Sequence, residues 1–285
     1  MNNLVLRAIT GALYVAALVG CTLGGEIAFF IFFTLVGALT TWEFITNVNA
    51  HDGATANRFI ATAATVAFMV AFRECCYPGH LTYAHFLPFV ATLLYLLISE
   101  LYRNEPHPLK NWAYAFAAQL YIALPLSMIF LLGVHYDPAA GTTSFNGWLP
   151  LSVFFFLWTS DTGAYLCGSA FSRFIPAKLF PRISPNKSWI GSVGGGVLVV
   201  ILALILSQVL PDVALSPLGW VGLGLTVCVF GTWGDLVESL FKRHLGIKDS
   251  GKILPGHGGM LDRFDSALLA IPAAVLYLQF VAKAF

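Results

Sequence analysis

Fixed charge is scarce in this chain. Only 10% of its 285 residues are Asp, Glu, Lys or Arg, whereas about 25% is usual for soluble domains. Hydrophobic residues make up 58% of the sequence and gather in long runs. These features exclude an ordinary soluble domain, and a net charge of +1 provides no basic field for nucleic acid. We therefore interpret the chain as an all-α, polytopic membrane protein.

Other patterns are missing as well. The five cysteines form no CxxC motif and lie in or beside apolar runs, so we expect buried small hydrophobic side chains and no disulfide framework. The apolar runs are continuous, which excludes the alternating pattern of a membrane β-barrel. The first run follows Arg7 without a convincing small-residue cleavage site. We interpret it as a retained span and not as a signal peptide.

The apolar runs predict about nine transmembrane helices, each close to the roughly 20 residues that cross a bilayer. Their approximate ranges are 8–23, 27–46, 58–75, 86–102, 111–133, 147–168, 190–210, 217–237 and 266–284. With the N-terminus in the cytoplasm, 13 of the 15 Lys and Arg residues fall on the cytoplasmic side. We expect N-terminal helices over 1–146, about five spans, and a C-terminal catalytic region over 147–285 with cytoplasmic loops 169–189 and 238–265.

The little charge that the chain has is concentrated in residues 231–265. This stretch holds five of the 14 acids and five of the 15 bases. Asp235 and Glu238 are three residues apart near the inner end of the eighth span, so they share a helix face, and Asp262 and Asp265 do the same where the ninth span begins. Two helix ends that present carboxylates can jointly hold a hard cation. Oxygen ligands without paired His or Cys favour Mg²⁺ over Zn²⁺.

Three other stretches hold polar residues of interest. Asp161, in WTSDTGAY, is an acid in an apolar run, which is costly unless it has a function. The sequence RISPNKSW, residues 182–189, offers a lysine and hydroxyl groups near a helix start, where a phosphate can bind. An ordinary basic loop is the alternative. Glu43 is a weaker case because it can simply reach the membrane interface.

A cluster of small residues, GSVGGG, occupies 191–196. Gly191 and Gly195 have the small-xxx-small spacing of closely packed helices. A phosphate-binding loop is the alternative, but the strand and lysine context of a P-loop is missing. The pattern therefore favours helix packing.

Three motifs together resemble the phosphatidate cytidylyltransferase (CDP-diacylglycerol synthase) family. Residues 239–265, SLFKRHLGIKDSGKILPGHGGMLDRFD, are similar to its C-terminal signature, S-x-hydrophobic-K-R, K-D and P-x-H-G-G-x-x-D-R-x-D. WTSDTGAY and SPNKSWIG resemble its D-x-x-A-Y and S-P-x-K-S/T-x-x-G elements. The length and the multi-span architecture also fit, although the similarity is specific only from about residue 158 onward.

The resemblance implies the reaction of CTP with phosphatidic acid to give CDP-diacylglycerol and pyrophosphate in phospholipid biosynthesis. It also implies Mg²⁺ dependence, with a second cation left open, and a site that faces the cytoplasm of a bacterial inner membrane. The metal-binding acids of the family map onto Asp235 and Asp262. A homodimer is an expectation from the family alone.

Elementary chemistry is compatible with this reaction, because the lipid phosphate is already an anionic nucleophile and needs no strong base. We expect the bases to clamp the triphosphate and the lipid head group, with hydroxyl and histidine groups as further donors and acids that orient the bases or join the metal. The catalytic set is predicted to be Asp235, Asp262, Lys248, Arg263 and Asp249. The substrate-binding set is predicted to be Ser184, Lys187, Ser188, Lys242, Arg243, His257, Asp161 and Asp265.

Other classes of function stay open at this stage. A transporter could use Asp161, Asp235 and Glu238 as an ion path, but these charges gather at one membrane face and no broken repeat is visible. A purely structural role as a membrane scaffold would not explain the charge cluster. A related lipid enzyme that uses CTP, such as a polyprenol or phytol kinase or a transferase acting on ether lipids, can be separated only by substrate tests.

Overall fold

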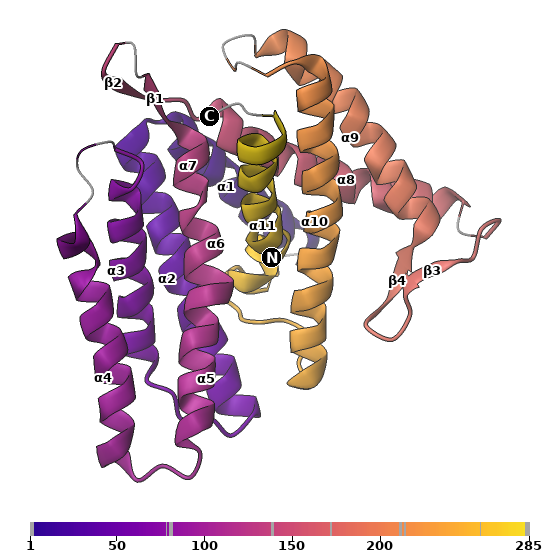
Figure 1. Ribbon diagram of the computed structural model, residues 1–285. Coiled ribbons are helices and arrows are strands. Elements are labelled where there is room, and N and C mark those ends of the chain that lie inside the picture. Colours follow the sequence, from indigo (N-terminus) through magenta and orange to yellow (C-terminus); the bar gives the residue numbers. More distant parts are fainter. Residues whose placement is uncertain are drawn as a thin grey trace. The chain divides into compact units, whose positions relative to one another are not determined.

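The computed structural model describes residues 3–77, 79, 82–137, 140–171, 173–210, 213, 215–256 and 258–282. These residues are mostly helical and include two short β-hairpins (Figure 1). The chain divides into two compact units, Met1–Gly147 with His244–Phe264, and Trp148–Arg243 with Asp265–Phe285. The segment His244–Phe264, which the sequence analysis assigned to the C-terminal region, therefore groups with the first unit.

The first unit consists of helices and one hairpin. Its elements in order are α1 (Asn3–Leu23), α2 (Glu26–His51), α3 (Arg58–Glu74), the 3₁₀ turn η1 (Tyr83–Phe86), α4 (Leu87–Arg103), α5 (Pro108–Ala118), the π turn η2 (Gln119–Ala123), α6 (Leu124–Ser127), α7 (Ile129–Gly133), β1 (Val134–Asp137) and β2 (Thr142–Phe145). Helix α3 packs against both α2 and α4 (Figure 1). Its core includes Phe29, whose ring meets those of Phe33 and Phe130 edge to face at 4.9 and 5.9 Å.

The second unit has long helices and the second hairpin. Its elements are α8 (Trp148–Phe171), β3 (Lys178–Phe180), β4 (Ser184–Ser188), α9 (Trp189–Val209), α10 (Pro217–His244), α11 (Leu261–Leu276) and the π turn η3 (Tyr277–Ala282). The last residue of α10 and the first four of α11 group with the first unit. Helices α8 and α9 pack along each other, and β3 and β4 pair antiparallel directly before α9 (Figure 1).

Helices occupy each of the nine segments in which the sequence predicted a span. Within the described residues, seven helices or continuous helical segments are long and apolar enough to cross a membrane. Helix α3 has only 17 residues, and α8 contains the polar stretch 159–162, which lowers its hydropathy. The structure thus supports a multi-pass helical protein, while the count of nine crossings stays a prediction.

The two predicted cytoplasmic loops have more regular structure than the sequence indicated. Helix α10 continues through His244 and α11 begins at Leu261, so the loop expected over 238–265 spans only 245–260. Glu238, Lys242 and Arg243 consequently lie on a helix. The loop expected over 169–189 contains the β3–β4 hairpin, and Ser188 caps α9 by accepting a hydrogen bond from Gly191 N at 3.2 Å.

Glycines allow α8 and α9 to approach closely. A Cβ atom on Gly195 would lie 2.6 Å from the carbonyl oxygen of Ser160, and one on Gly191 would lie 2.8 Å from that of Ala164. Real side chains cannot occupy these positions unless the helices move apart. The GSVGGG stretch therefore serves helix packing, as its spacing favoured.

This packing predicts opposite effects for two adjacent glycines. Alanine normally stabilises a helix interior by about 1 kcal/mol relative to glycine, but at Gly195 the clash with Ser160 should outweigh this gain by overpacking. A Cβ atom on Gly196 meets nothing within 4 Å. We expect Gly195→Ala to lower the unfolding temperature in detergent by several degrees and Gly196→Ala to leave it unchanged or raise it. Equal effects of both substitutions would contradict the packing account.

Candidate active site

The close approach of α10 and α11 builds the site in the second unit. Gly234 is buried on α10, and a Cβ atom there would lie 2.6 Å from the carbonyl oxygen of Asp265 and 2.9 Å from Cα of Ser266. Only glycine lets the two backbones come this near. Because Asp235 is the next residue on α10, the same contact places its side chain beside Asp265.

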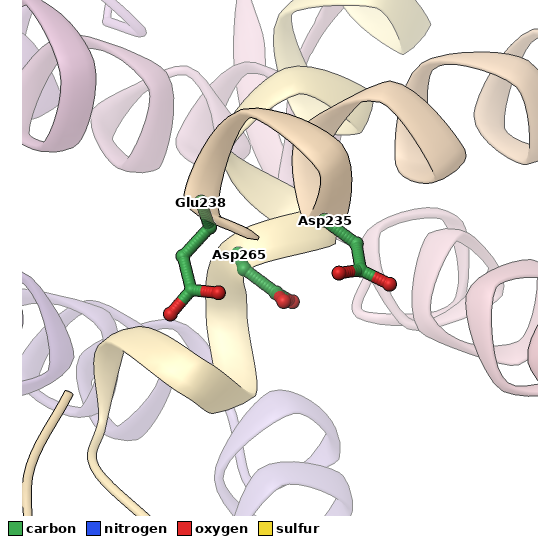
Figure 2. Close-up of side chains that lie close together, drawn as sticks. All are labelled: Asp235, Glu238 and Asp265. Carbon is green, nitrogen blue, oxygen red and sulfur yellow. The ribbon is translucent and has the colours of Figure 1, made fainter. Parts of the chain in front are cut away.

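Three carboxylates meet at this contact. Asp235 and Glu238 extend from α10 and Asp265 extends from α11, all toward the same space (Figure 2). One oxygen from each residue lies within 4.8 Å of the others. Glu238 is fully buried, whereas Asp235 keeps 32% of its side chain exposed. The cluster is thus anchored in the protein on one side and open on the other.

Two lysines face these acids. Lys187 from β4 places its Nζ atom 2.6 Å from Oδ2 of Asp235, and Lys242 places Nζ 2.5 Å from Oε2 of Glu238, one turn earlier on α10. The hydroxyl group of Ser239 lies 3.2 Å from Oδ1 of Asp235 and donates to it. Three carboxylates against two ammonium groups leave one excess negative charge.

The cluster fits a hard divalent cation. Its donors are oxygen atoms only, which Mg²⁺ and similar ions prefer. Like charges held within 5 Å repel each other strongly in an apolar environment, and a bound cation removes this repulsion. Asp235 was predicted as a ligand and belongs to the cluster. Glu238 and Asp265 complete it; the sequence placed both among the carboxylates that can jointly hold a cation, although the predicted metal set named only Asp235 and Asp262.

Asp161 adds a further acid near the cluster. It lies on α8, is exposed, and interacts electrostatically with Asp265. The preceding residue, Ser160, is buried and its Oγ atom lies 3.1 Å from Sγ of Cys228 on α10. The predicted motif around Asp161 therefore borders the carboxylate cluster within the same unit.

The predicted phosphate-binding sequence lies on the β3–β4 hairpin. Ser184 begins β4 opposite Phe180, and Lys187 reaches Asp235 as described. Ser188 is buried and caps α9, so its hydroxyl group is engaged by the backbone. Arg243, near the end of α10, is exposed. The hairpin thus supplies a lysine to the acidic cluster.

A basic cavity lies in the first unit. Its volume is about 780 Å³, and glycine backbone at positions 251, 256 and 258 forms part of its wall. The charged residues that line it are Arg7, Lys248, Asp249, Lys252 and Arg263. A cavity lined by four cationic side chains, one acid and glycine backbone that a ligand can approach closely suits a phosphorylated ligand. Lys248, Asp249 and Arg263 were predicted site residues, and the structure brings them together here.

Helix α1 is attached to the loop that forms this cavity. The Nε atom of Arg7 donates to the carbonyl oxygen of Gly256 at 2.7 Å, and Thr10 Oγ1 donates to that of Pro255 at 3.1 Å. Arg7 is not recognisable as a site residue from the sequence, because one arginine before an apolar run is what the positive-inside rule predicts for any such helix. Arg7 belongs to the cavity through its long-range contact alone.

Asp262 is engaged by the same loop. Its Oδ2 atom accepts hydrogen bonds from Ser250 N at 2.8 Å, Ser250 Oγ at 2.9 Å and Gly259 N at 2.8 Å. It is not a member of the cluster that could hold a metal among the described residues. Its role as a metal ligand stays a prediction. His257, predicted as a phosphate donor, lies outside the described residues.

The chain as a whole matches a known protein family. The chain belongs to the cytidylyltransferase family, whose model matches residues 5–281. It is 36% identical over 189 residues to the phosphatidate cytidylyltransferase of Haemophilus influenzae, a stretch that covers 62% of this chain and 63% of that protein. The resemblance drawn from the sequence motifs is thereby confirmed at the level of the family.

Two further relatives have the same printed name. The phosphatidate cytidylyltransferase of Bacillus subtilis is 47% identical over 119 residues, covering 41% of this chain and 42% of that protein. That of Staphylococcus aureus is 48% identical over 124 residues, covering 43% of this chain and 45% of that protein. The chain therefore matches between 42% and 63% of the length of these relatives.

The glycine contact predicts how metal affinity depends on helix spacing. Gly234→Ala changes no charge, but its Cβ atom must push α11 away and spread the carboxylates. We expect Mn²⁺ affinity, measured by titration with electron paramagnetic resonance, to fall about tenfold or more, because ligand geometry controls metal binding. Asp235→Asn should weaken binding similarly, and Gly196→Ala should not. Unchanged affinity in Gly234→Ala would refute the proposed geometry.

Proposed function

We propose that the protein is a phosphatidate cytidylyltransferase, which converts CTP and phosphatidic acid into CDP-diacylglycerol and pyrophosphate. The observation that carries the proposal is the cluster of Asp235, Glu238 and Asp265 in a chain of the cytidylyltransferase family. The names of the three relatives support the choice of substrates. The basic cavity supports a ligand with several phosphate groups.

The reaction is a single displacement at phosphorus. An oxygen of the lipid phosphate forms a bond to the α-phosphorus of CTP while the bond to the bridging α–β oxygen breaks, and pyrophosphate leaves with that electron pair. The attacking phosphate is already ionised at neutral pH, so no side chain has to remove a proton. The protein contributes mainly by aligning the two phosphates and neutralising their charge.

The bases of the chain perform this neutralisation. Lys248, Lys252 and Arg263 hold phosphate oxygens in the cavity, and the backbone of the glycine-rich loop approaches them closely. Lys187 and Lys242 act in the second unit, where each also keeps a carboxylate in position. Asp249 orients the neighbouring bases. Arg243 and the donors Ser184 and His257 complete the proposed binding set.

The acidic cluster would hold Mg²⁺, which supplies positive charge for the phosphates of CTP. Asp235 and Asp265 are the partly buried members of the proposed ligand set, and the third member, Glu238, is fully buried and paired with Lys242. Asp262 stays a predicted metal ligand. Asp161 borders the cluster and is proposed to bind substrate.

The enzyme is proposed to work at the inner face of a bacterial membrane, with nine crossings and a cytoplasmic N-terminus. The distribution of Lys and Arg supports this topology, because the two segments that contain the site also contain most of the bases. The phosphatidic acid would then reach the site from the cytoplasmic leaflet while its acyl chains stay in the bilayer.

CMP transfer tests the proposed reaction. Purified protein in detergent with labelled CTP, phosphatidic acid and Mg²⁺ should form labelled CDP-diacylglycerol, and chelation of the metal should abolish the product. Asp235→Asn and Asp265→Asn should each lose at least about a hundredfold in kcat/KM, because an unscreened phosphate charge is costly in the site. The kcat/KM of Asp262→Asn in the same assay shows whether Asp262 contributes to catalysis as much as Asp235 and Asp265 do.

A matched basic residue provides the control. Arg263→Ala should lower kcat/KM for CTP about tenfold or more, as loss of a charge-assisted phosphate contact does. Arg58→Ala should be nearly neutral, since Arg58 stacks on Trp42 at 4.6 Å and lines no part of the cavity. Product formed from diacylglycerol in place of phosphatidic acid would identify a lipid kinase, and no turnover with either lipid would contradict the proposal.

Reporter fusions test the topology. Alkaline phosphatase, which is active only outside the cytoplasm, should be inactive when fused after Arg243 and active when fused after Phe145 or at the C-terminus. Green fluorescent protein should give the opposite pattern. An active phosphatase after Arg243 would overturn the cytoplasmic placement of the site.

A further inference from the structure

Glu43 is a buried acid that the proposed reaction does not use. It lies on α2, in the first unit, and only 5% of its surface is exposed. Its Oε2 atom accepts hydrogen bonds from Leu261 N at 2.9 Å and from Ser250 Oγ at 3.3 Å. Leu261 is the first residue of α11, so a side chain more than 200 residues earlier caps this helix.

Two glycines allow the loop 245–260 to pass close to this carboxylate. A Cβ atom on Gly251 would lie 2.0 Å from Glu43 Oε1, and one on Gly259 would lie 2.5 Å from both carboxylate oxygens. The loop therefore has glycine where it passes the carboxylate. Asn47, one turn further along α2, donates to the carbonyl oxygen of Ser250 at 2.6 Å. Two residues on one face of α2 thus hold the same point of the loop.

A chain of hydrogen bonds leads from Glu43 to the cavity. Ser250 Oγ lies between two carboxylates, 3.3 Å from Glu43 Oε2 and 2.9 Å from Asp262 Oδ2, and its single hydroxyl hydrogen is shared between these acceptors. Asp262 in turn accepts from Gly259 N, so both ends of the loop are connected. Arg263 and Lys248, which line the cavity, are each within two residues of these contacts.

We propose that Glu43 is a positioning residue of the enzyme: its carboxylate caps α11 and holds the loop 245–260 in the conformation that binds the phosphates of CTP. This inference rests on the proposed function for its effect on catalysis. Its structural part, the ordering of the loop, stands independently. Glu43 acts through the loop and touches no substrate.

The nature of the contacts decides which substitutions are tolerated. Glutamine retains an acceptor oxygen for Leu261 N and Ser250 Oγ, whereas alanine removes both bonds. We expect kcat/KM for CTP to fall about tenfold to a hundredfold in Glu43→Ala, because loss of the acceptor leaves buried donors of the loop unpaired, which costs a factor of that size. Glu43→Gln should stay within about threefold of the wild type.

Hydrogen exchange measures the structural part without any turnover. In Glu43→Ala, the amides of peptide 248–261 should exchange faster, while those of α3 stay protected. In Glu43→Gln, the exchange rates of peptide 248–261 and of α3 should both match those of the wild type. Glu100 provides the control, because it is also buried in the first unit and accepts from Arg103 and Asn111, each at 2.8 Å. Glu100→Ala should leave exchange in 248–261 unchanged.

A second variant keeps the test valid if Glu43→Ala does not fold. Gly251→Ala retains the carboxylate but forces the loop away from it, so it should also speed exchange in 248–261 and lower kcat/KM. In the double variant with Glu43→Ala the clash is absent, and the two losses should not add. Additive losses would contradict direct contact between the two positions.

The outcomes separate the two proposals. If the wild type makes no CDP-diacylglycerol, the proposed function fails, while the exchange experiment still tests the ordering of the loop. If the wild type is active but Glu43→Ala keeps wild-type exchange and kcat/KM, the positioning role is wrong. Glu43→Gln with the same defects as Glu43→Ala would also overturn it, because charge and not hydrogen bonding would then be required.

Discussion

Electrostatic repulsion between carboxylates is the constraint on which the site depends. Asp235, Glu238 and Asp265 bring three negative charges within 5 Å in a protein whose helices are otherwise apolar. Such an arrangement is costly unless cations balance it. Lys187 and Lys242 do so in part. The remaining negative charge makes the cluster a candidate site for a divalent cation, and the contact at Gly234 holds the two helices that carry the carboxylates close together.

In the first unit, the structure depends on holding a polar, glycine-rich loop, residues 245–260, in one conformation. Among the Leu, Ile and Met side chains of residues 245–260, only that of Leu245 is buried. Hydrogen bonds hold the loop instead: Asp262 binds the loop from α11, Glu43 and Asn47 from α2, and Arg7 from α1. The bases on this loop thereby line a cavity in a fixed arrangement, which would reduce the entropy lost on binding of the proposed phosphate ligand.

The sequence predicted those parts of the structure that depend on local pattern. Apolar runs located the helices, and the charge concentrated in 231–265 includes most of the acids and bases that the structure brings together in the candidate site. Element ends were less predictable: α10 extends seven residues beyond the expected 237, because Glu238 and Lys242 pair one turn apart and continue the helix with polar residues. Hydropathy alone ends such a helix too early.

Contacts between distant segments could not be predicted. Glu43 stands in an apolar helix near the expected membrane interface, and nothing adjacent in the sequence connects it to Ser250, 207 residues later. Glu238 was recognised as sharing a face with Asp235, but only the packing of α10 on α11 shows that Asp265 joins them. The same holds for Lys187, whose role as a partner of Asp235 depends on the hairpin before α9.

The position of the bound metal tests the central claim most directly. Crystals of the protein grown with Mn²⁺ and a non-hydrolysable CTP analogue would reveal the ion by its anomalous scattering. The account predicts a peak bonded to carboxylate oxygens of Asp235 and Asp265, with Glu238 beside them and the nucleotide phosphates completing the coordination. A single peak bonded to Asp262 and distant from Asp235 and Asp265 would contradict it.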